Sequence, residues 1–314
     1  MFKLIKYFFK ETLISFYQEK DKFFVQKRVI KKEKILSEEI FEFEKDEFLK
    51  FINISFMENT QTYISTIIDT FNQGIVNSCN HSKYKELGIN IDNIKILCLK
   101  DFSVFIGLYE LNEFKKEITQ YKVDFIFSPY LIIQENSTKK DNTLYILISN
   151  NFASLIIYKN KEIIYSNTLQ LEDNSTPQQI EDIKDNDSVL DDIDDLVDDI
   201  DDLDSLDDDL DDLENIDDID SIDELPHTNE DNINSQLETT KNELSIVEFI
   251  KNSIKDYYEN YEANFLEQIE IMYNKEISNN LLKTLKDETL LEIETKECDL
   301  LSNINNLALK EINV

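Results

Sequence analysis

The sequence predicts an α/β protein made of two halves that share one order of elements. Each half opens with three consecutive strand-like runs, helical and strand-like runs alternate after them, and a long acidic stretch interrupts only the second half. The chain is expected to fold around a large core, because 41% of its 314 residues are hydrophobic, including 20 Phe and 14 Tyr. A repeated order of elements indicates a duplicated architecture rather than one open sheet.

In the first half, β-branched and aromatic runs predict strands, and apolar residues at helical spacing predict helices. The expected strands are residues 12–17, 22–29, 33–43, 62–68, 94–99, 102–108 and 123–127. The expected helices are residues 46–56, with Asp46 as the N-cap, and residues 110–121. The first three strands are separated by short polar breaks, so we expect them to form a meander.

The second half repeats the meander and closes with helices and strands. The expected strands are residues 144–148, 154–159, 162–168, 265–273 and 290–294. The expected helices are residues 244–260, residues 278–287 behind a Ser278 cap, and residues 298–312. The second half is therefore expected to run as three strands, an insertion, and then helix, strand, helix, strand, helix.

The insertion, residues 171–243, is polar and contains an unusual acidic tract. Residues 191–224 hold 20 acidic and no basic residues, which is more than half of the net charge of −34. Such a chain is a poor partner for nucleic acid, which requires an extensive positive surface. Leu and Ile recur every three or four positions in the tract, so two interpretations stay open: a disordered, solvated insertion, or a segment that becomes helical on a basic-rimmed groove.

The remaining composition predicts a cytoplasmic protein. Three well-separated cysteines, Cys79, Cys98 and Cys298, favour buried or half-buried thiols in a reducing compartment over a disulfide framework. The apolar N-terminus is interrupted by lysines and is followed by no small-residue cleavage site, so we expect no signal peptide. No apolar run reaches the roughly 18 residues that a membrane-spanning helix needs.

Several stretches resemble the PilM and GspL branch of the actin-like family. Residues 101–133, "DFSVFIGLYELNEFKKEITQYKVDFIFSPYLII", resemble the family's strand–helix–strand segment that returns from a small inserted subdomain. Residues 144–168 resemble the opening meander of its second lobe. Residues 246–312, which include "NNLALKEI", resemble its closing segment. The resemblance implies an actin-like (ribonuclease H-like) two-lobe fold, each lobe βββαβα. The implied first lobe is residues 1–135 with a reduced subdomain at about 70–100, and the second is residues 143–170 and 244–314, with residues 171–243 as a flexible acidic insertion.

The glycines that the family uses to approach a nucleotide's phosphates are missing. The first hairpin reads Gln18-Glu19-Lys20-Asp21, the second reads Ser149-Asn150-Asn151 where the family has Asp-x-Gly, and the adenosine turn reads Tyr273-Asn274-Lys275-Glu276. We therefore expect no catalytic residue and no cofactor. The resemblance then implies a non-catalytic scaffold that docks the cytoplasmic tail of a PilN-like inner-membrane protein, with self-association into a ring or oligomer possible. The alternative is an actin-like ATPase with atypical nucleotide binding.

Other candidate sites are few. His81 and His227 lie in polar stretches typical of solvated loops, and the acidic tract lacks the glycine of a calcium-binding loop, so we expect no dedicated metal site. A basic cluster on the second strand blunts a sheet edge or faces solvent, or else it meets the acidic tract, an acidic partner or anionic lipid. The candidate partner-binding residues are Lys27, Arg28, Lys31, Lys32, Asp191, Asp194, Asp198 and Asp201.

Overall fold

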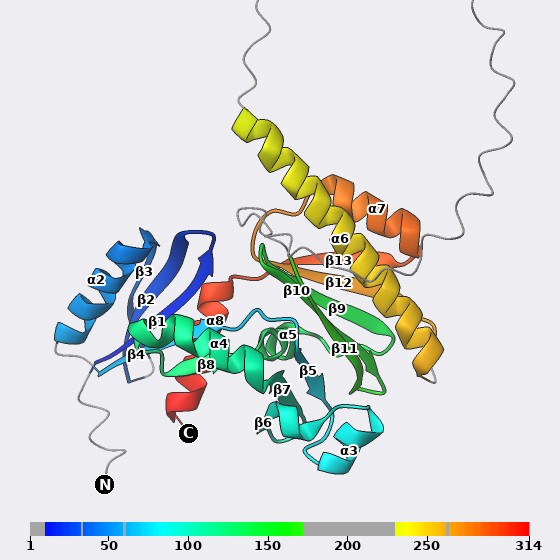
Figure 1. Ribbon diagram of the computed structural model, residues 1–314, viewed down its shortest axis with the longest axis horizontal. Helices are drawn as coiled ribbons and strands as arrows, with labels where there is room; N and C mark the ends of the chain where they lie inside the picture. Colours follow the sequence, from blue (N-terminus) through cyan, green and yellow to red (C-terminus); the bar gives the residue numbers. More distant parts are fainter. Residues whose placement is uncertain (1–9, 33, 59–60, 172–229, 262–263, 314) are drawn as a thin grey trace, which may run out of the picture. The chain divides into compact units, whose positions relative to one another are not determined.

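The computed structural model describes residues 10–32, 34–58, 61–171, 230–261 and 264–313 (Figure 1). Its first lobe is built on a five-stranded mixed sheet with the order β3-β2-β1-β4-β8. The strands are β1 (Glu11–Glu19), β2 (Lys22–Lys31), β3 (Lys34–Glu44), β4 (Gln61–Ile67) and β8 (Phe125–Phe127). The pairs β1–β2 and β2–β3 are antiparallel, whereas β1–β4 and β4–β8 are parallel.

The second lobe has a five-stranded sheet of the same design, with the order β11-β10-β9-β12-β13. Its strands are β9 (Thr143–Ile148), β10 (Phe152–Lys159), β11 (Glu162–Gln170), β12 (Gln268–Tyr273) and β13 (Glu292–Glu297). The meander is again antiparallel, and β12 and β13 again add in parallel. Two sheets with one strand order and one set of directions confirm the predicted two-lobe actin-like α/β fold.

Helices cover the outer faces of both sheets. In the first lobe, α2 (Lys45–Met57) buries Phe48 and Ile52 against β1 and β2, next to α4 (Leu108–Ile118). In the second lobe, α6 (Glu230–Asn260) and α7 (Asn279–Thr289) bury their apolar faces against the central strands. Ser278 caps α7 as expected, because its hydroxyl accepts from the amide of Leu281 at 3.0 Å.

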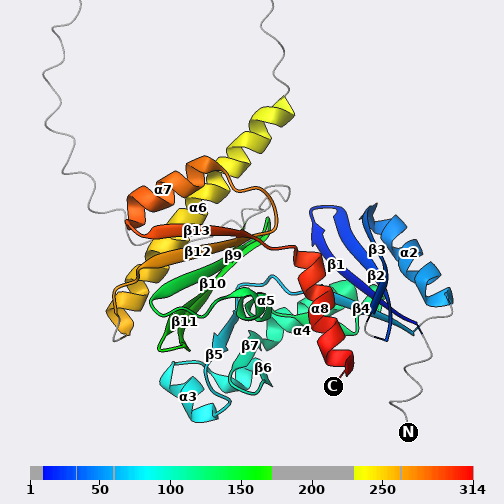
Figure 2. The ribbon, with the colours of Figure 1, turned by 180° about the vertical axis from the view of Figure 1, so that it is seen from behind.

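Two helices lie between the inner faces of the two sheets, and each packs on the lobe to which the neighbouring part of its own chain does not belong. The final helix, α8 (Leu300–Asn313), belongs to the second half of the chain but packs on β1, β2, β4 and β8 (Figure 2). The short helix α5 (Pro129–Asn136) follows β8 of the first lobe but packs on β9 and β10. Together with both inner sheet faces they form one apolar core, which includes Tyr130, Tyr145 and Ile304.

A small sheet interrupts the chain of the first lobe, and its strand β5 (Gln73–Val76) lies against β11 of the second lobe (Figure 1). The strands of this sheet, β5, β6 (Ile94–Cys98) and β7 (Ser103–Gly107), have the order β5-β7-β6, and α3 (His81–Glu86) lies between β5 and β6 in the chain. The central strand β7 lies beyond the end that we expected for this subdomain, near residue 100. Gly74 permits a close approach, because a Cβ there would lie 2.6 Å from the Phe105 ring.

Two expectations for the first lobe are wrong in detail. The helix α5 was not expected, and its last residues fall in the polar break expected at residues 134–142. Pro129 occupies its first turn, where a missing N–H is tolerated. Asp46 is not the N-cap: β3 runs directly into α2, so Glu44 takes that position without a side-chain cap, and Asp46 lies in the first turn, where its charge suits the helix dipole.

The helix α6 begins earlier than predicted. We expected a flexible stretch up to residue 243, but α6 starts at Glu230 and continues for 31 residues. The apolar face of its second half is fixed on the sheet, so the helical register can extend backwards from there. The acidic tract at residues 191–224 lies outside the described residues. Each helix in the described part is too short or too polar to traverse a lipid bilayer.

Candidate functional site

The candidate site is the junction at which hairpins of the two lobes meet. The β1–β2 hairpin brings Gln18 and Glu19 from the first lobe, and the β9–β10 hairpin brings Asn150 and Asn151 from the second. Asp69 joins them just after the end of β4. These are the positions at which the resemblance places the phosphate-facing turns of a nucleotide site.

Two asparagines connect the lobes directly. Asn151 Nδ2 donates to the carbonyl oxygen of Gln18 at 2.8 Å and to Asp69 Oδ2 at 3.0 Å. Asn150 Nδ2 donates to Glu19 Oε2 at 2.9 Å. The side-chain amides of the second hairpin therefore donate hydrogen bonds to Gln18, Glu19 and Asp69 of the first lobe.

A second set of contacts comes from the segment after β12. Lys275 Nζ forms an ion pair with Glu19 Oε2, and the same ammonium lies 4.9 Å from the centroid of the Phe24 ring. Asn274 Nδ2 donates to the Tyr17 hydroxyl at 2.9 Å, while its Oδ1 accepts from the amide of Leu300 at 3.0 Å. The end of β12 is thus fixed both to the first hairpin and to the start of α8.

The junction is acidic and partly desolvated. Burial raises the pKa of Asp69, although the hydrogen bond from Asn151 opposes the shift. Burial also raises the pKa of Tyr17 to about 12, in spite of its hydrogen bond with Asn274 and with added contributions from the charges of Glu19 and Asp299. Within the described residues, the buried Oε1 of Glu19 has no hydrogen-bond partner, whereas Oε2 of the same carboxylate is bound by Asn150 and Lys275.

These residues do not fit a nucleotide. Polyphosphate binding relies on closely approaching backbone N–H groups and on free cations. Here the turns carry side chains, Lys20 adopts a left-handed φ of 53° without being glycine, and Lys275 is neutralised by Glu19. The carboxylates of Glu19 and Asp69 would repel phosphates at the same place. The arrangement can fix the lobes to one another, and no chemical step follows from it.

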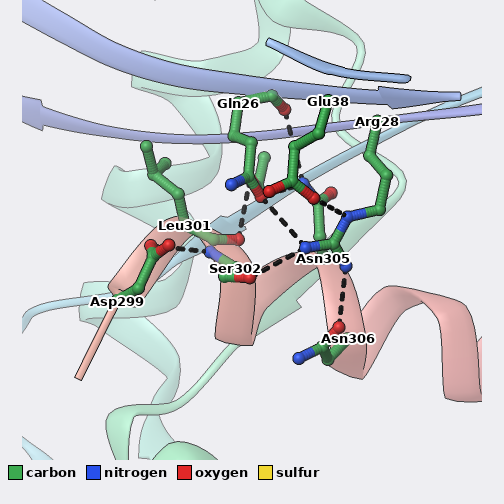
Figure 3. Close-up of polar contacts among 9 residues, drawn as sticks. Gln26, Arg28, Glu38, Asp299, Leu301, Ser302, Asn305 and Asn306 are labelled. Carbon is green, nitrogen blue, oxygen red and sulfur yellow. Dashed lines mark hydrogen bonds and ion pairs between the residues drawn. The ribbon is translucent and has the colours of Figure 1, made fainter. Parts of the chain in front are cut away.

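Arg28, one of the predicted partner-binding residues, is buried inside the fold (Figure 3). Its Nε donates to Glu38 Oε2 at 2.6 Å, and its terminal nitrogens donate to Ser302 Oγ at 2.8 Å and to Asn306 Oδ1 at 2.7 Å. Gln26 and Asn305 continue this polar layer, since Asn305 Nδ2 donates to Gln26 Oε1 at 2.9 Å. The guanidinium therefore attaches α8 to the first sheet and is inaccessible to a partner, which corrects its assignment to a binding surface.

The other basic residues of the cluster differ from Arg28. Lys27 faces α2, where its ammonium contacts Glu58 at 2.7 and 2.8 Å. Lys31 and Lys32 are exposed at the β2–β3 turn, so partner binding by them stays a prediction. Asp191, Asp194, Asp198 and Asp201 lie outside the described residues, as does His227, whereas the exposed His81 begins α3.

The cysteines depart from the expectation of buried or half-buried thiols at two positions. Cys298 is buried, and burial raises its pKa to about 11. Cys79 and Cys98 are exposed, and the neighbouring Cys98 thiol is the largest cause that raises the pKa of Cys79. All three are free thiols.

Sequence reasoning identified the two asparagines of the second hairpin but missed their acceptors. Nothing near Glu19 or Asp69 in the chain distinguishes them from the other 64 acidic residues among the total of 66. One signal was available: Asn151 stands where the resembled family has glycine, and Lys275 lies in the family's glycine-rich turn, so an acidic partner opposite them could have been sought.

Comparison with known proteins gives two family matches. Residues 144–313 match a model described as "Domain of unknown function (DUF8341)", and residues 8–134 match a model described as "Domain of unknown function (DUF8569)". The first match covers β9 to α8, and the second covers β1 to α5. No curated protein matches the chain.

Solved structures resemble the chain at low identity. A Bacteroides thetaiotaomicron protein with an actin-like ATPase fold and unknown function is 12% identical at a TM-score of 0.46, covering 98% of this chain and 97% of that one. A PilM–PilN type IV pilus biogenesis complex is 5% identical at 0.48, covering 96% and 98%. The ethanolamine utilization protein EutJ from Carboxydothermus hydrogenoformans is 6% identical at 0.41, covering 96% and 89%. Each of these similarities concerns the path of the backbone and gives no information about activity.

Proposed function

The chain belongs to the DUF8341 family, and from its closed interlobe junction we propose that it is a non-catalytic scaffold that docks the cytoplasmic tail of an inner-membrane protein. The observation that carries this proposal is the set of side-chain bridges at the junction. Glu19 is bound by Lys275 and Asn150, and Asp69 is bound by Asn151, where the resemblance would place a nucleotide. A two-lobe fold whose junction residues do not suit phosphates retains its surfaces for protein binding.

The partner follows from charge and from the resemblance to the PilM and GspL family. Cytoplasmic flanks of membrane helices are usually rich in Lys and Arg. A chain with a net charge of −34 attracts such a tail and accelerates the encounter. The proposed place of action is the inner face of the inner membrane, in an envelope-spanning machine such as a type IV pilus, a type II secretion system or a flagellar motor.

The proposal is tested by binding to native membrane extracts. The tagged full-length chain should recover a membrane protein with a basic cytoplasmic tail, and a synthetic peptide of that tail should bind with an affinity that falls as salt rises. The matched control is a peptide with every Lys and Arg replaced by Gln. Deletion of residues 191–224 should change the association rate more than the dissociation rate. Salt-independent binding, or recovery of no membrane protein above an untagged control, would contradict the scaffold role.

A further inference from the structure

The strand β3 is the outer strand of the first sheet. One of its edges pairs with β2, and in the described part of the chain no strand pairs with the other edge. Such an edge presents main-chain N–H and C=O groups that a further strand can use. Figure 1 shows β3 at the margin of the lobe, beside α2.

The edge carries apolar side chains that the lobe leaves exposed. Ile35 is 52% exposed and Ile40 is 65% exposed. Their partners on β2, Ile30 and Gln26, lie on the face that α8 covers, since Ile30 is in the central core and Gln26 bonds Asn305. The helix α8 packs on β1, β2, β4 and β8. It does not cover Ile35 and Ile40 of β3, so these two side chains form an exposed apolar surface next to it.

The opposite face of β3 carries a carboxylate that is unpaired within the described part of the chain. Glu39 pairs in register with Lys27, but the ammonium of Lys27 is taken by Glu58 at 2.7 and 2.8 Å. Among the described residues, Glu39 has no ion pair, whereas its neighbour Glu38 is bound by Arg28. On the face of Ile40, the carboxylates of Glu38 and Glu42 are neutralised by Arg28 and Lys22. The unpaired charge of the edge therefore lies on the other face, at Glu39.

We propose that the free edge of β3 binds an extended segment of a partner in which apolar residues alternate with Lys or Arg. Because side chains of a strand alternate between its faces, such a segment places apolar groups on Ile35 and Ile40 and cations beside Glu39. This inference rests on the proposed function and says where on the scaffold a basic tail docks.

Two features of β3 limit the occupant. The register with β2 shifts between Val29 and Ile30, which leaves Leu36 without a partner and sets one end of the regular edge. The basic turn with Lys31 and Lys32 repels cations at that end. The Lys or Arg residues of the bound segment therefore lie beside Glu39 and not beside this turn. A second copy of β3 is disfavoured, because it would bring like carboxylates together across the strands.

The test uses a fluorescein-labelled peptide of about eight residues, alternating Val and Lys, and the full-length chain. The variant Glu39→Lys with Ile40→Ser changes the edge. The matched control is Glu292→Lys with Leu290→Ser, which makes the same charge change at exposed positions on and just before β13, the outer strand of the other sheet. Urea midpoints of both variants report whether folding is retained.

We expect saturable binding by fluorescence anisotropy, weakened about tenfold or more by the β3 changes and less than about twofold by the β13 changes. Amides of β3 should also become protected from hydrogen exchange when the peptide is bound. Two results would overturn the proposal. One is equal weakening by both variants, which would show attraction to acidic surface in general, and the other is an absence of saturable binding to the unmodified chain.

The outcome is separable from that of the proposed function. If the native membrane tail binds the chain and the β3 changes leave its affinity unaltered, the scaffold role stands and the β3 site is wrong. If the alternating peptide binds at β3 but no membrane protein is recovered, the β3 site stands and the scaffold role is wrong.

Discussion

The carboxyl group of Asp69 lies between the two lobes and accepts a hydrogen bond from Asn151. Burial raises its pKa in the folded state above the ordinary value of about 4. The folded protein therefore holds this proton in a pH range in which the unfolded chain has released it. The contribution to stability is present at low pH and is lost as pH rises through the folded pKa.

Replacing Asp69 by Asn removes that titration while leaving an oxygen that can accept from Asn151. The free energy of unfolding of the Asp69→Asn variant should fall less with rising pH than that of the native chain, and the variant should be the more stable at neutral pH. Urea unfolding from about pH 4, near the ordinary pKa, to about pH 8 measures the difference. Parallel curves for the two proteins would contradict the assignment.

Arg28 makes a second residue-level prediction. Arg28→Ala leaves Ser302, Asn306 and part of Glu38 without their donor, so we expect the free energy of unfolding to fall by about 2 to 3 kcal/mol. The control is Lys31→Ala, an exposed residue on the same strand, for which the change should stay within about 0.5 kcal/mol. The measurement is the urea midpoint at unchanged m, and equal losses in the two variants would count against the buried network.

At the level of elements, the β10–β11 hairpin turns through two residues in the left-handed region. Asn160 has a φ of 54° and Lys161 a φ of 66°. Both positions of this two-residue turn need positive φ, and the favoured sequence is Asn-Gly. Lys161→Gly should therefore raise the free energy of unfolding by about 1 kcal/mol, because it relieves the strain of a Cβ in that region.

The same turn supplies a control for this prediction. Lys161 N donates to Asp141 Oδ1 at 2.7 Å, a bond that glycine preserves, so the change isolates backbone conformation. Lys159→Gly, at the last residue of β10, should instead destabilise the chain, since glycine weakens a strand. Equal effects of the two substitutions on the urea midpoint would show that the left-handed turn is not the cause.

The elements that the sequence predicted best are those with local signals. Both meanders were found because alternating β-branched and aromatic residues end at short polar turns, and α7 was found through Ser278. The helix α5 was missed because its residues are buried nearly all round and show no polar face. The early start of α6 was missed because its first residues are polar, and a helix can extend from a packed end regardless.

At the scale of the whole molecule, the two lobes share one inner core through α5 and α8. The sequence predicts that the phosphate-binding turns are lost, because the absence of glycine is a local property. It could not anticipate the pair of Glu19 with Lys275, because the two residues are 256 positions apart and meet only when both lobes are folded. The exposed edge of β3 depends in the same way on where α8 packs.

The chain's own side chains close the junction between the lobes, and we therefore expect it to accept no nucleotide. The most direct measurement is the melting temperature of the full-length chain with millimolar Mg-ATP, compared with magnesium and inorganic phosphate at equal ionic strength. A ligand present at 100 times its Kd adds about 2.7 kcal/mol to the stability of the state that binds it. We predict no difference in melting temperature between the two conditions. A saturable rise with Mg-ATP alone would contradict the claim.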